Sequence, residues 1–169
     1  MQRRQVILAL LSMTAGLSAC AMNPPPSAAT ETQTVFVMRH LQKGEGQDPP
    51  LTQEGEANAR AVANLLADRG IRAIFVTDTL RARQTAAPLA TRLGLTPVVY
   101  DPRSPDTLVA QVRAIPGNAL VVGHSNTVPD LVQRFGGPAI APLDEQTDFG
   151  TIWAVDRATG TAATLTVSP

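Results

Sequence analysis

Cysteine, histidine and lysine are scarce in this sequence of 169 residues. Cys20 is the only cysteine, so the chain has no partner for an intramolecular disulfide. The two histidines, His40 and His124, lie far apart and lack the paired ligand spacing of a zinc site. The 14 basic residues balance the 14 acidic ones, which argues against a nucleic-acid partner and against a basic membrane-binding face. We therefore expect no metal, no cofactor and no nucleic-acid partner.

The first 19 residues have the pattern of a signal peptide. Two arginines precede a mostly apolar stretch, residues 6–17, which is too short to span a bilayer. This stretch runs into Leu17-Ser18-Ala19-Cys20, which resembles the lipobox of bacterial lipoproteins. The resemblance implies cleavage before Cys20, lipidation of that residue and anchoring to a bacterial membrane on its periplasmic side. Ala21 follows the cysteine instead of Asp, which slightly favours the outer membrane. A plain secretory signal with an incidental cysteine is the alternative.

A tether is predicted between the signal and the domain. Residues 20–33 are rich in proline, serine and threonine, include three successive prolines and contain little to bury. Such a segment is typical of an extended linker. The folded domain is therefore expected over residues 34–169.

Short apolar runs alternate with segments of helical spacing along this domain. We expect strands at 35–39, 71–77, 97–100, 119–123, 151–156 and 162–167, and helices at 52–69, 79–93, 104–115 and 127–135. This alternation is typical of an α/β fold, and it predicts a three-layer α/β/α sandwich around a mostly parallel sheet.

Four residues mark the ends or interruptions of the predicted helices. Thr52, Asp78 and Ser104 are expected to cap the first three helices with their side-chain oxygens. Pro88 lies inside the second helix and is expected to kink or split it, because proline lacks the N–H that the helix needs.

Each histidine follows directly on an apolar run, Val35–Arg39 in one case and Leu120–Gly123 in the other. Ligand sites of open α/β sheets are built where the strands end. We therefore expect His40 and His124 to act together at one edge of the sheet.

Four segments in order resemble the histidine phosphatase superfamily, which contains phosphoglycerate-mutase-like enzymes and acid phosphatases. They are Arg39-His40, Asp48-Pro49-Pro50-Leu51-Thr52, the run Thr79–Ala86 with its pattern Arg-Ala-x-x-Thr-Ala, and Gly123-His124-Ser125-Asn126-Thr127. The resemblance covers nearly the whole domain and is strongest to a small bacterial branch whose first motif reads Arg-His-Ala-Glu-Lys. It implies a phosphoglycerate-mutase-like fold and the hydrolysis of small phosphorylated substrates.

The resemblance assigns His40 as the nucleophile that forms phosphohistidine. It makes Arg39, Arg81 and His124 a clamp for the phosphate. Such chemistry needs an uncharged imidazole and cations around the phosphoryl oxygens, and the guanidinium fork of arginine grips phosphate in two places. Lys43, the only lysine, matches the branch motif and is expected to add positive charge at the pocket mouth, although a solvated loop lysine is an equal alternative.

The chain departs from the family pattern at two places. Leu41-Gln42 replaces Ala-Glu after the nucleophile, and Ser125 stands where some members carry an acid after the second histidine. Asp101 is therefore the candidate general acid. The acidic segment 144–148 is expected to be a solvated loop more than a pocket edge.

These observations favour a metal-independent phosphomonoester hydrolase. The main alternative is a catalytically weak or inactive lipoprotein that binds phosphorylated ligands, since no secure acid is present. The segment 123–127 also partly resembles the nucleophile elbow of serine hydrolases, but no histidine follows Ser125, and those enzymes need one.

Overall fold

The computed structural model describes residues 33–167. Six strands form one sheet in the order β3-β2-β4-β1-β5-β6. The strands are β1 (Thr34–Arg39), β2 (Ile71–Thr77), β3 (Val98–Tyr100), β4 (Asn118–Gly123), β5 (Thr151–Asp156) and β6 (Thr161–Thr166). The helices are α1 (Gln53–Leu66), α2 (Leu80–Leu93), α3 (Pro105–Arg113) and α4 (Val128–Arg134).

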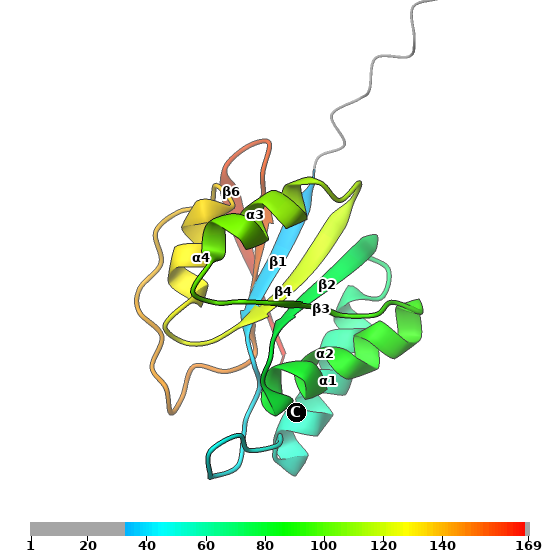
Figure 1. Ribbon diagram of the computed structural model, residues 1–169, viewed down its shortest axis with the longest axis vertical. Helices are drawn as coiled ribbons and strands as arrows, with labels where there is room; N and C mark the ends of the chain where they lie inside the picture. The colour runs from blue at the N-terminus through cyan, green and yellow to red at the C-terminus, as the bar shows by residue number, and fades with distance from the viewer. Residues whose placement is uncertain (1–32, 168–169) are drawn as a thin grey trace, which may run out of the picture.

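The sheet lies between two layers of helices, as the alternating pattern predicts (Figure 1). β3, β2, β4 and β1 are parallel, and β5 and β6 extend the sheet as an antiparallel pair. One apolar core packs α1 and α2 against one face of the sheet, and a second packs α3 and α4 against the other. The prediction of a three-layer α/β fold with a mostly parallel sheet is therefore confirmed.

The helix ends agree with the predictions in part. Thr52 caps α1 by accepting from the Gly55 N–H, as expected. The cap of α2 is Thr79 and not Asp78, whose carboxylate instead accepts from Arg83. Ser104 precedes α3 but makes no capping bond with its side chain, so that expectation is wrong. α2 runs without a break through Pro88, so the helix is not split there.

Gln33, the last residue of the predicted tether, is attached to the domain. Gln33 is buried, and its side-chain amide donates to the carbonyl oxygens of Val112, Ile115 and Gly117. These contacts tie the residue before β1 to the end of α3 and the turn before β4. The predicted signal peptide, the lipidated Cys20 and the rest of the tether lie outside the described residues. Between residues 33 and 167, the structure contains no helix long and apolar enough to cross a membrane.

The loop after β1 packs closely on the first turn of α1. A Cβ atom on Gly55 would lie 2.2 Å from the Gln42 carbonyl oxygen, so only glycine fits between the helix and this loop. The Thr52 N–H donates to the same carbonyl at 3.0 Å. Because Gln42 lies two residues after His40, this contact fixes the course of the chain next to the predicted nucleophile.

Candidate active site

The parallel pairing of β1 and β4 brings the two histidines together. Arg39 pairs with Gly123 at the ends of these neighbouring strands, and each histidine is the next residue. The His40 N–H continues the ladder by donating to the Gly123 carbonyl at 3.0 Å. The imidazole centroids lie 5.2 Å apart, with the rings arranged edge to face. The expectation that both histidines share one edge of the sheet is therefore met.

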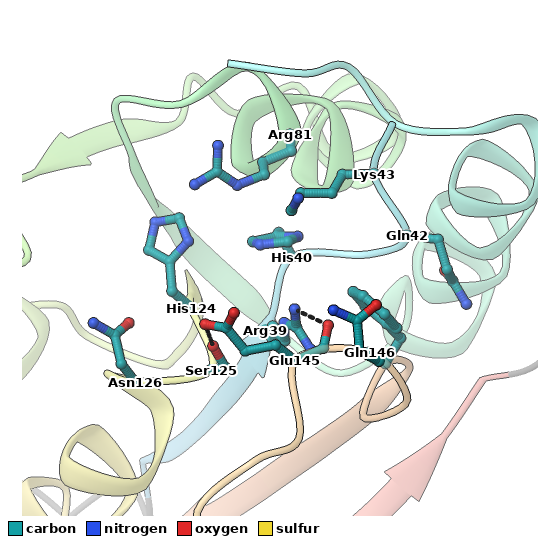
Figure 2. Close-up of a pocket in the computed structure, with 11 residues that line it drawn as sticks. Arg39, His40, Gln42, Lys43, Arg81, His124, Ser125, Asn126, Glu145 and Gln146 are labelled. Carbon is teal, nitrogen blue, oxygen red and sulfur yellow. Dashed lines mark hydrogen bonds between the residues drawn. The ribbon is translucent and has the colours of Figure 1, made fainter. Parts of the chain in front are cut away.

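A cavity of about 550 Å³ opens above the two rings (Figure 2). It is lined by Arg39, His40, Gln42, Lys43, Arg81, His124, Ser125, Asn126, Glu145, Gln146 and Phe149. The five residues that the family resemblance assigns to phosphate chemistry, Arg39, His40, Lys43, Arg81 and His124, are thus gathered around a single space. Three cationic side chains and two imidazoles make this a site for an anion.

The His40 ring is held in the orientation that a nucleophile needs. Its Nδ1 lies 2.8 Å from the Leu41 carbonyl oxygen, and since that oxygen only accepts, Nδ1 carries the proton. Nε2 then has the free lone pair. Burial is the main cause that lowers the pKa of His40 to about 3; His124, Arg39 and Arg81 contribute to this decrease, and the bond to Leu41 opposes it. His40 is therefore neutral at physiological pH.

His124 is neutral for similar reasons but is held at the other nitrogen. Burial, followed by the charges of Arg81 and Arg39, lowers its pKa to about 4. Its Nε2 lies 2.9 Å from the hydroxyl oxygen of Thr77 at the end of β2, and that hydroxyl also contacts Thr79. The end of β2 thus supports the imidazole of His124.

Arg39 is clamped by the loop before β5. Its two Nη atoms donate to the carbonyl oxygens of Asp144, Glu145 and Asp148, and its guanidinium lies 4.0 Å from the centroid of the Phe149 ring. Its buried Nε has no partner among the described residues. Buried N–H groups are nearly always paired in folded proteins, so this group is an exception.

Arg81 and Lys43 complete the cationic lining. Arg81 contacts the Asp48 carboxylate at 3.4 Å, and its buried Nε also has no partner within residues 33–167. The Asp48 carboxylate accepts from the Leu80 N–H as well, so it joins the loop after β1 to the start of α2. The backbone of Lys43 forms a bridge with Leu51, and its side chain lies beside Arg81 and His40 in Figure 2.

The two residues that depart from the family motif do not crowd the nucleophile. Leu41 is 0% exposed and packs in the core beneath α1 and α2, and its N–H donates to the Thr85 hydroxyl. The Gln42 side chain turns toward α1, where it bonds to Glu54 and Asn58 (Figure 2). The bulk of Leu41 thus falls outside the space above His40, whereas Gln42 still lines the cavity, with its side-chain amide bonded to α1.

Asp101 lies away from this cavity. It lines a neighbouring cavity of about 460 Å³, which reaches His124 from the side of β3. Both of its carboxylate oxygens accept from the Arg103 guanidinium, and these bonds lower the pKa of Asp101. A carboxylate held ionised in this way is poorly suited to donate a proton, so its role as general acid stays a prediction with an unfavourable geometry.

The sequence reasoning missed the contribution of the segment between α4 and β5. Glu145 and Gln146 line the cavity, and Phe149 lies against both Arg39 and His40. The expectation of a solvated acidic loop describes only part of this segment. Asp144 does serve the loop itself, since its carboxylate accepts from the backbone N–H groups of Gln146 and Thr147.

A family model described as the histidine phosphatase superfamily (branch 1) matches residues 33–104. This range includes β1, the nucleophile motif, α1 and the Arg81 segment. Over this range the chain is similar to the histidine phosphatase superfamily.

The chain is 26% identical over 148 residues to an 8-oxo-(d)GTP phosphatase of Mycolicibacterium smegmatis, and the match covers 77% of this chain. It spans only 46% of the length of that protein, so the larger relative contains much that has no counterpart here.

Solved structures agree with the assignment. The protein histidine phosphatase SixA, complexed with tungstate, superposes with a TM-score of 0.61 and 26% identity, over 80% of this chain and 97% of that one. The mycobacterial glucosyl-3-phosphoglycerate phosphatase Rv2419c gives a TM-score of 0.60 at 16% identity, covering 80% of this chain and 98% of its own, a likeness of fold alone.

Proposed function

We propose that this protein is a phosphatase that hydrolyses phosphomonoesters through a phosphohistidine intermediate on His40. The observation that carries the proposal is the state of the His40 ring. It is neutral, its Nδ1 is bonded to the Leu41 carbonyl, and its Nε2 lone pair is left for the cavity. A neutral, oriented imidazole beside a cluster of cations is what attack on a phosphate monoester requires.

In the first step, Nε2 of His40 attacks the phosphorus and the bond to the leaving oxygen breaks. The cations stabilise this step because the transferred group carries its charge on three oxygens. Arg39 and Arg81 line the cavity and bring their positive charges to those oxygens, and Lys43 adds a further positive charge at the rim.

In the second step, water attacks the phosphoryl group and the N–P bond breaks. His40 leaves as a neutral imidazole, since the Leu41 carbonyl keeps the proton on Nδ1 throughout. The same cations hold the phosphoryl oxygens in both steps. The residues therefore suit hydrolysis without a metal ion.

The relatives suggest two candidate classes of substrate. Similarity to the 8-oxo-(d)GTP phosphatase supports small phosphorylated compounds, and similarity to SixA supports phosphohistidine in proteins as a second candidate. An exported protein would rarely meet phosphorelay proteins of the cytoplasm, so we favour small phosphomonoesters.

We further propose that Cys20 is lipidated and anchors the domain to a bacterial membrane on its periplasmic side. The support is the lipobox-like sequence and the proline-rich segment behind it. In a bacterial host fed a labelled fatty acid, the wild-type chain is expected to take up label and sediment with membranes. Cys20→Ser is expected to do neither, and a labelled Cys20→Ser chain would refute the assignment.

Hydrolysis of p-nitrophenyl phosphate tests the phosphatase proposal. The wild-type chain should release p-nitrophenol, and a folded His40→Ala variant should not. If neither chain turns over this substrate or a panel of natural phosphomonoesters, yet the wild type binds inorganic phosphate, the protein is a binder of phosphorylated ligands instead.

A further inference from the structure

Expulsion of an alkoxide from a phosphomonoester needs a proton at the leaving oxygen. The phosphate clamp does not offer one, because its arginines stay protonated and its two histidines are neutral. Asp101 is paired with Arg103 in the neighbouring cavity. A carboxyl group that lines the cavity itself would meet the need.

Glu145 is such a group, and both ends of the residue are attached to the site. Its backbone carbonyl accepts from Arg39 at 2.8 Å, and its carboxylate accepts from the hydroxyl of Ser125 at 3.1 Å. Ser125 is 8% exposed and follows His124 directly, so this bond points the carboxylate toward the second histidine. In the view of Figure 2, Glu145 lies on one side of the His40 ring and the cations Arg81 and Lys43 on the other.

We propose that Glu145 protonates the leaving group in the first step and takes a proton from water in the second. This inference rests on the phosphatase function proposed above. Glu145 lines the same cavity as the proposed nucleophile, so its carboxyl group shares the space that the leaving group of a bound substrate would occupy.

The steps balance. As His40 Nε2 forms its bond to phosphorus, the P–O bond breaks, and the leaving oxygen takes the carboxyl proton of Glu145 to become an alcohol. Water then attacks the phosphoryl group and gives a proton to the Glu145 carboxylate. The N–P bond breaks, inorganic phosphate departs, and the neutral imidazole and the carboxyl group are restored.

The test compares a good and a poor leaving group in the full-length chain. Glu145→Gln removes the acidic proton but keeps an oxygen for Ser125 and the backbone carbonyl for Arg39. We expect kcat/KM for an alkyl phosphate such as glycerol 2-phosphate to fall by ~10²-fold or more, the usual scale for a general acid. We expect kcat/KM for p-nitrophenyl phosphate to fall only about a few-fold, because p-nitrophenolate is a good leaving group that needs no proton from an acid. Glu45→Gln removes an equal charge from a nearby loop residue that does not line the cavity, and should leave both rates unchanged.

Three results would overturn the proposal, and they are distinguishable. Equal losses on both substrates in Glu145→Gln would mean that the carboxylate acts on binding or on the shape of the site. No loss on either would mean that it is a solvated side chain. A wild-type chain inactive on both substrates would refute the phosphatase function, and this inference with it.

Discussion

The two sides of the cavity are built in different ways. One side consists of strand ends. Arg39 is the last residue of β1, and His40 and His124 directly follow β1 and β4, so main-chain pairing of the two strands sets their positions. The other side is the exposed segment 144–149, which reaches the site through three carbonyl bonds to Arg39 and one aromatic contact. The strand side holds the groups proposed to bond to phosphorus and its oxygens, and the loop side contacts those groups. In this proposal the strand ends carry the covalent chemistry, and the loop supplies the group that serves the leaving oxygen.

The strand side and α2 should give the largest losses after the nucleophile itself. Arg81→Ala and His124→Ala are each expected to lower kcat by about 10²- to 10³-fold, the scale for one partner of a developing transition-state charge. Steady-state kinetics on p-nitrophenyl phosphate measure this. Arg83→Ala is the matched control, since Arg83 lies two residues on in the same helix and pairs with Asp78 away from the cavity. An equal loss in Arg83→Ala would contradict the assignment.

With p-nitrophenyl phosphate as substrate, the loop side should give smaller losses, and the loss in a Phe149 variant should fall on binding. Phe149→Ala removes the ring beneath the Arg39 guanidinium, a contact worth about 0.5–1 kcal/mol or somewhat more when desolvated. We expect KM to rise by about 3- to 10-fold with kcat nearly unchanged, and the KM-against-kcat split measures this. Phe149→Leu, which keeps apolar bulk but no π face, separates the cation–π contact from simple packing. If kcat fell as far as in His124→Ala, the division of labour between the two sides would be wrong.

Acid should lower the free energy of unfolding through the two histidines of the strand side. The pKa of His40 is lowered to about 3 and that of His124 to about 4, whereas both lie near 6.5 in the unfolded chain. As pH falls below about 6.5, the unfolded chain therefore binds more protons than the native one, and the free energy of unfolding decreases. Urea unfolding at neutral and acidic pH should show a smaller decrease in a His40→Asn/His124→Asn variant. Equal decreases in the two chains would show that other groups control the acid sensitivity.

Chelation should have no effect. The positive charge of the site comes from Arg39, Arg81 and Lys43, and the proposed steps need no metal ion. Phosphatase activity should be the same before and after dialysis against EDTA. Loss of activity that returns when a divalent cation is added would contradict the metal-free chemistry.

The strand side could be predicted from the sequence and the loop side could not. A buried apolar run followed by His40 or His124 indicates a strand end, and parallel strand ends meet at one edge of the sheet. The segment 136–149 has no periodic pattern, so its course depends on tertiary contacts, here those between its carbonyl oxygens and Arg39. The same limit applies to two carboxylates. Residue type and position favoured Asp101 as the general acid and Asp78 as the cap of α2, but each carboxylate is paired with a nearby arginine.

Direct detection of the phosphorylated residue is the measurement that tests this account most directly. The full-length chain is mixed with p-nitrophenyl phosphate, quenched in alkali, which preserves phosphohistidine, and digested for mass spectrometry. The account predicts one added phosphoryl group on the peptide that contains His40, and none in a His40→Asn chain. Turnover by the wild type with the phosphoryl group on another residue, or undiminished turnover by His40→Asn, would contradict it.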